Sequence, residues 1–81
     1  MDRNQIICKL NTIFQNIFDD NSISLTDETC SDDIEEWDSL EQINLIESIQ
    51  DSFKIKFNFS EVYSIRNVGE IVDQIVKKVE D

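Results

Sequence analysis

The sequence predicts an all-α protein, a small bundle of three main helices plus one short helix. It contains no proline and a single glycine, Gly69, so it lacks the turn residues that an all-β fold requires. Apolar residues recur at helical spacing in three separate segments. At 81 residues and 40% apolar composition the chain can form one small core, and we expect a single domain over residues 1–81.

The first helix is expected from about Asn4 to Phe18. Its apolar residues fall on one helical face, namely Ile6, Ile7, Leu10, Ile13, Phe14, Ile17 and Phe18. Residues 19–37 then show no sustained period, and a loop of this length suggests either a function or a short buried turn. We expect three apolar residues to anchor this loop on the core: Ile23, Leu25 and Ile34.

The second helix is expected from Ser39 to Phe53, with Asp38 as its N-cap and Glu41 completing a capping box. Placing residues at 100° intervals gives a core stripe of Leu45, Ile46, Ile49 and Phe53, with Ile43 at its edge. Leu40 falls on the opposite side, among Asn44, Glu47 and Asp51. The pattern predicts a leucine held in water beside Ser39, although a lone exposed leucine on a surface needs no function.

The remaining residues predict a connection, a short helix and a last helix. Ile55, Phe57 and Phe59 alternate with polar residues, and without a second strand we interpret them as an extended connection with inward aromatic side chains. A short helical turn is expected from Ser60 to about Ile65. Asn67 and Glu70 form a second predicted capping box. The last helix that follows has a core face of Val68, Ile71, Val72, Ile75, Val76 and Val79.

Charge limits the possible partners. The chain has 18 acidic and 7 basic residues, a formal charge of −11, with no lysine or arginine between Leu10 and Phe53. This charge argues against nucleic acid and anionic membrane, and favours a basic protein surface. A solvated acidic face that only keeps the protein soluble is the simpler alternative. With no histidine and no convergent set of polar groups, we expect no catalytic residues and no enzymatic activity.

We expect no metal site and no membrane span. From Asp19 onward, Ile23, Ser24 and Cys30 occupy the positions where a calcium-binding EF-hand needs an oxygen ligand, a glycine and a glutamate. Cys8 and Cys30 lack metal-site spacing and are expected to be reduced thiols. No apolar run approaches the roughly 20 residues that cross a bilayer, and the first residues do not open a signal peptide. We therefore expect a cytoplasmic, monomeric protein.

Ser39 is the candidate site of modification. At the first position of a capped helix its hydroxyl is exposed and fixed in direction. From the residues alone, covalent attachment, phosphorylation and an ordinary first-turn serine all remain open. The stretch Glu36-Trp37-Asp38-Ser39-Leu40-Glu41 resembles the Asp-Ser-Leu attachment motif of acyl carrier proteins. The resemblance extends through the following helix and, more loosely, over nearly all 81 residues.

This resemblance implies a function. Ser39 would carry 4'-phosphopantetheine, transferred from coenzyme A by a phosphopantetheinyl transferase, and Asp38 would help to hold the magnesium that this enzyme uses. The protein would be a discrete acyl carrier that holds acyl intermediates as thioesters on this arm. It would present them to acyl-loading and acyl-processing enzymes with basic docking patches, in fatty-acid, polyketide or another specialised pathway. The expected docking residues are Leu40, Glu41, Ile43, Asn44, Glu47 and Asp51.

Two residues depart from fatty-acid carriers and leave the partners open. Glu47 stands where those carriers often have an apolar residue, and Trp37 where many have a small one. Two other functions would use the same residues. One is a small acidic helical adaptor that binds a basic protein without a cofactor, and the other is a switch in which a kinase phosphorylates Ser39.

Overall fold

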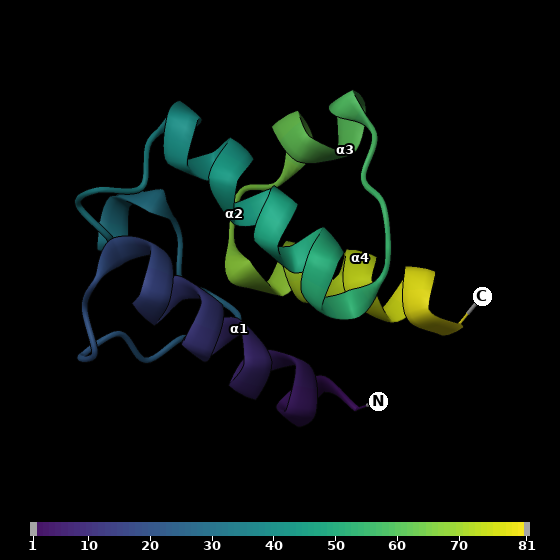
Figure 1. Ribbon diagram of the computed structural model, residues 1–81, viewed down its shortest axis with the longest axis horizontal. Coiled ribbons are helices and arrows are strands. Elements are labelled where there is room, and N and C mark those ends of the chain that lie inside the picture. The colour runs from purple at the N-terminus through teal and green to yellow at the C-terminus, as the bar shows by residue number, and fades with distance from the viewer. Residues whose placement is uncertain (1, 81) are drawn as a thin grey trace.

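The computed structural model describes residues 2–80 and is helical throughout, as the sequence predicts (Figure 1). Its elements are α1 (Arg3–Phe18), the 3₁₀ turn η1 (Ser31–Asp33), α2 (Ser39–Phe53), α3 (Phe59–Ser64) and α4 (Val68–Glu80). Helix α1 packs against α2 and α4, and α3 packs against α2. In Figure 1 the loop between α1 and α2 closes the left-hand end of the bundle. The described residues form no strand, only an isolated bridge between Cys30 and Asn67.

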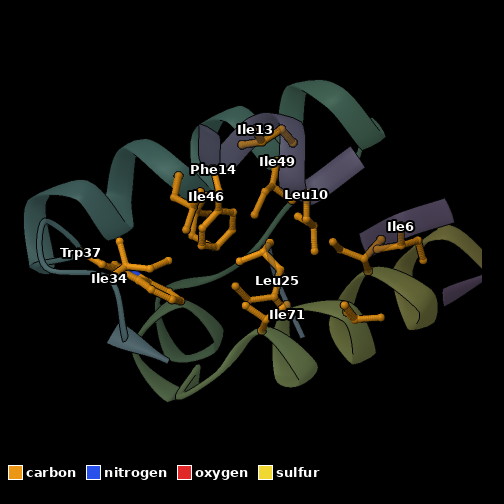
Figure 2. Close-up of a cluster of buried hydrophobic side chains, with 14 of the residues drawn as sticks. Ile6, Leu10, Ile13, Phe14, Leu25, Ile34, Trp37, Ile46, Ile49 and Ile71 are labelled. Atoms are coloured by element: carbon orange, nitrogen blue, oxygen red, sulfur yellow. The ribbon is translucent and has the colours of Figure 1, made fainter. Parts of the chain in front are cut away.

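The core is built from the three predicted helical faces (Figure 2). Its fully buried side chains come from α1, α2 and α4, and they are Phe14, Ile6, Leu10, Leu45, Ile49, Ile71, Ile75, Val68 and Val72. Burying an aliphatic or aromatic side chain of this size stabilises the fold by about 1.5–3 kcal/mol. Ile7, Ile17, Phe53 and Val76 are partly buried at the edge of the same cluster. Packing of these faces therefore provides most of the stability that holds the helices together.

Helix α1 begins one residue earlier than predicted because of a capping box that the periodicity does not reveal. The Asp2 carboxylate accepts from the Gln5 N–H at 2.8 Å, and the Gln5 side chain accepts from the Asp2 N–H at 3.0 Å. The signal was present as Asp-x-x-Gln at the start of an apolar run. At the other end, Asp19 adopts the left-handed conformation, with a φ of 51°, and closes the helix.

The long loop of residues 19–38 is anchored as predicted. Leu25 and Ile34 are buried in the core cluster, and Ile23 packs against its edge. Side chains of α1 bond the loop backbone: the Asn11 side chain accepts from the Leu25 N–H at 2.8 Å, and the Gln15 amide donates to the Ile23 carbonyl at 3.0 Å. The predicted turn is η1, although its own side chains are exposed and Ile34 directly after it is the buried residue.

Two residues assigned to the core are exposed. Ile55 and Phe57 pack against the cluster as predicted, but Phe59 is 80% exposed. Asn58 is the N-cap of α3, so the helix begins at Phe59 and the alternation of buried and exposed residues ends there. Phe59 stacks on Tyr63 one turn later, with ring centroids 6.3 Å apart. Val79 is 38% exposed because the core ends about one turn earlier, at Ile75.

The start of α4 is sealed by the loop that precedes α2. The Val68 N–H donates to the Thr29 carbonyl and the Gly69 N–H to the Asp27 carbonyl, both at 2.8 Å. Asn67 caps the helix by accepting from the Glu70 N–H at 2.9 Å. The predicted capping box is wrong in its second half, because the Glu70 carboxylate accepts from the Arg66 N–H at 3.2 Å rather than from Asn67.

Gly69 is required by this contact. A Cβ atom there would lie 2.9 Å from the Asp27 carbonyl oxygen, which is backbone and cannot rotate away. We predict that Gly69→Ala lowers the free energy of unfolding by about 1 kcal/mol, since the cost of about 1–3 kcal/mol for overpacking exceeds the helix preference of alanine. Urea unfolding monitored by circular dichroism measures the change. Ser52→Ala on the exposed side of α2 is the control and should leave stability nearly unchanged or slightly raised.

Candidate functional site

The N-terminus of α2 presents Ser39 to solvent. Helix α2 begins at this serine, and Asp38 is the N-cap, accepting from the Glu41 N–H at 2.9 Å. The predicted capping box is wrong in its return contact. Glu41 instead accepts from the Asn44 amide at 3.1 Å, while the Asp38 N–H donates to the Glu36 carbonyl at 3.0 Å. Asp38 alone therefore fixes the direction of the first turn that carries Ser39.

An open groove of about 520 Å³ lies beside Ser39. Its walls come from the loop before α2, from α2 itself, from α3 and from the linker to α4, and the lining residues are Ser31, Trp37, Asp38, Ser39, Gln42, Ile43, Val62, Tyr63, Ile65 and Arg66. No local pattern indicated the last four, because they follow Ser39 by more than 20 residues and only tertiary packing brings them near it. Ile46 and Ile49 do not line this groove and are buried in the core.

A short chain of hydrogen bonds joins three walls of the groove. The Trp37 indole N–H donates to the Gln42 side-chain carbonyl at 2.6 Å, and the Gln42 amide donates to the Val62 carbonyl at 3.3 Å. Trp37 itself is buried against Phe14 in an edge-to-face contact with ring centroids 5.2 Å apart. The entrance to α2 is thus tied to α1 on one side and to α3 on the other.

The outer face of α2 contains the predicted docking residues. Leu40 is 68% exposed, as the helical spacing predicts, and Ile43 is 45% exposed. Asn44, Glu47 and Asp51 are exposed on the same helix, while Glu41 is half-buried. Ile43 also lines the groove, so the acidic face and the groove meet at this residue. The structure thereby brings all six predicted docking residues onto the helix that begins at Ser39.

Helix α3 is held to α4 by an ion pair. The Lys78 ammonium lies 2.9 Å from one Glu61 carboxylate oxygen and 3.0 Å from the other, and it also lies over the Phe57 ring at 5.2 Å from the centroid. The Asn58 N–H donates to the same carboxylate at 2.9 Å. These two contacts, the backbone hydrogen bond first and the Lys78 ammonium second, lower the pKa of Glu61.

The residues around Ser39 fit a covalently attached phosphate. The serine is exposed, and within residues 2–80 no acceptor is bound to the N–H groups of Ser39 and Leu40. Free N–H groups in a first turn stabilise a negative charge placed there. No three histidine, cysteine or carboxylate side chains among the described residues converge as they would around a metal ion.

Comparison with known proteins agrees with this geometry. The family model for the phosphopantetheine attachment site matches residues 8–75. The holo acyl carrier protein from Geobacter metallireducens, solved by NMR, is 44% identical with a TM-score of 0.86, and the alignment covers 91% of this chain and 85% of that one. The chain belongs to the acyl carrier protein family. The crystal structure of the acyl carrier protein from Thermotoga maritima is 25% identical with a TM-score of 0.87, covering 99% of this chain and 93% of that one.

Membership of this family establishes the general role of the chain. As an acyl carrier protein it is a carrier and not an enzyme, and it binds phosphopantetheine covalently. The search of curated proteins found no significant match. None of the described helices is both long enough and apolar enough to cross a membrane.

The lowered pKa of Glu61 predicts a pH-dependent contribution to stability. Because the folded state favours the ionised carboxylate, this contribution is fully present above the ordinary glutamate pKa and is lost as pH falls through the lowered folded value. We predict that Glu61→Gln, which keeps an oxygen acceptor for Asn58, is less stable than the wild type at pH 7. The difference in free energy of unfolding should become smaller as the pH is lowered from 7 to 3.

Urea unfolding at both pH values measures this difference. Glu28→Gln in the acidic loop removes one negative charge from an exposed carboxylate and is the control for the total charge of the carrier. A Glu61→Gln deficit that is as large at pH 3 as at pH 7 would contradict the ion-pair explanation and indicate a packing effect.

Proposed function

We propose that this acyl carrier protein attaches its phosphopantetheine at Ser39 and presents acyl intermediates to successive partner enzymes. The observation that carries the proposal is the exposed Ser39 hydroxyl, held by the Asp38 cap at the first position of α2 and beside an open groove. The described chain offers no other serine in such a position together with the Asp-Ser-Leu motif. We further propose that residues 1–81 act as one carrier domain.

The protein's own residues position the attachment. Asp38 orients the first turn, and we propose a second role for it, which is to hold the magnesium ion of the phosphopantetheinyl transferase while Ser39 is modified. The terminal thiol of the attached group supplies the chemistry, by holding the acyl group as a thioester. Since the anchor is rigid and the arm is flexible, the carrier raises the effective concentration of the acyl group at each docked enzyme.

The outer face of α2 is the proposed docking surface. Glu41, Glu47 and Asp51 place negative charge beside the exposed Leu40, in a stretch of the chain without a single lysine or arginine. Such a surface increases the rate of encounter with a basic patch, and exposed charges leave the complex weak enough to exchange. Suitable partners are the transferase and acyl-loading or acyl-processing enzymes with basic patches.

The proposed pathway is fatty-acid, polyketide or another specialised acyl biosynthesis. The exposed Glu47 and the buried Trp37 support a specialised pathway over the common fatty-acid one, because both differ from what fatty-acid carriers often have at these positions.

We predict that Ser39→Ala abolishes loading and leaves the fold intact. The wild type, incubated with coenzyme A, magnesium and a broad-specificity phosphopantetheinyl transferase, should gain the mass of one phosphopantetheine. Ser52→Ala, an exposed serine of the same helix, should load like the wild type. Intact-mass spectrometry measures the products, and a phosphopantetheine adduct on the folded Ser39→Ala variant would refute the assignment.

We predict that Glu47→Lys slows loading by the transferase by about two- to tenfold at low ionic strength, because an exposed attractive charge becomes a repulsive one. The measurement is kcat/KM for loading at two salt concentrations. The effect should shrink at high salt, where exposed charges are screened.

The control for this prediction is Glu28→Lys, which makes the same change of charge in the loop before α2. It should alter kcat/KM less than Glu47→Lys does. Equal effects of the two variants would mean that total charge steers the encounter, without a defined docking face.

A further inference from the structure

The groove beside Ser39 contains one cationic side chain, that of Arg66. Two other cations of the chain are engaged in ion pairs, Arg3 with Asp27 and Asp73, and Lys78 with Glu61. Arg66 is exposed, and no carboxylate of residues 2–79 forms an ion pair with it, although the chain has 18 acidic residues. An arginine without an ion pair therefore lines the same groove as Ser39.

The backbone of Arg66 is fixed on both sides. The Arg66 N–H donates to the Glu70 carboxylate at 3.2 Å, and the next residue, Asn67, forms a bridge with Cys30. Directly after Cys30, Ser31 lines the same groove. The linker between α3 and α4 is thus fastened to the loop that leads into α2, and the Arg66 side chain starts from a defined point on the rim of the groove.

Attachment at Ser39 creates a need for a positive charge at this place. The phosphodiester that joins the arm to the serine carries one negative charge, and it would stand next to Asp38 and close to Glu41 on the acidic side of the protein. The free N–H groups of the first turn offset this repulsion only in part. A guanidinium presents paired N–H donors that match two phosphate oxygens, which a point charge such as lysine does not.

We propose that Arg66 binds the phosphodiester oxygens on Ser39 and so holds the first part of the arm over the groove. The proposal rests on the proposed attachment at Ser39. It makes Arg66 a positioning residue of the loaded carrier, one that links the α3–α4 linker to the N-terminus of α2. The unloaded carrier has no need of this contact, which gives the proposal a readout independent of any partner enzyme.

NMR of the loaded and unloaded carrier tests the contact. In the wild type, loading should shift the Arg66 side-chain Nε–H resonance downfield, and the shift should weaken as salt is raised from about 0.01 M to about 1 M, where the screening length falls from about 30 Å to about 3 Å. The phosphorus resonance of the loaded protein should move in Arg66→Gln and move less in Arg66→Lys. Lys56→Gln, an exposed cation outside the groove lining, should leave it in place.

The outcomes separate the two proposals. An arm that loads on Ser39 while the Arg66 Nε–H and the phosphorus resonance of Arg66→Gln stay unchanged would overturn the role of Arg66 alone. Failure of the folded wild type to load would overturn the attachment itself. Inorganic phosphate added to the unloaded carrier should shift the Arg66 Nε–H far less than loading does, because it is not held at the serine. An equal shift at millimolar phosphate would mean that the groove is a general anion site and would refute the specific contact.

Discussion

The packing of Trp37 is the interaction on which the geometry of the attachment site depends. Its ring lies edge-on against Phe14 in the core. The indole N–H donates a hydrogen bond to the Gln42 side-chain carbonyl, and the Gln42 amide donates to the Val62 backbone carbonyl. The residue thereby fixes the end of a long loop one position before the Asp38 cap. A buried indole cannot shift without opening the core. Trp37 therefore holds the start of α2 in one position, even though the loop before it has little regular structure.

Helix α2 divides its residues between two tasks. Leu45, Ile46 and Ile49 are buried and secure the helix, so its outer side can present Leu40 and carboxylates without weakening the fold. The cations are concentrated elsewhere, on α4, near the start of α1, and in the segment after α2. Ser39 is the first residue of α2 and lines, together with Arg66, the groove beside it.

Local patterns in the sequence were sufficient to predict the fold and the position of Ser39. Helical periodicity located α1, α2 and α4 to within a residue or two, and the Asp38 cap followed from residue types. Two features could not be predicted from local patterns. They are the choice between competing hydrogen-bond partners and the contacts between residues far apart in the chain. Asn58 caps α3, so Phe59 begins a helix and points outward although the alternation of apolar residues predicts it to be buried. The Glu41 carboxylate accepts from the Asn44 amide instead of from the Asp38 N–H. The α3 side of the groove comes from residues remote from Ser39 in the chain.

The groove has one rigid side and one that is weakly held. The side formed by Trp37, Asp38 and the start of α2 is anchored in the core. The other side is α3, six residues long with none fully buried, which is held by the Gln42 hydrogen bond to Val62, by the packing of Val62 on the core and by the Glu61–Lys78 pair. Local opening occurs where few apolar contacts are broken, so α3 is the wall that moves at the lowest cost in free energy. We therefore expect the width of the groove to change more readily than the position of Ser39.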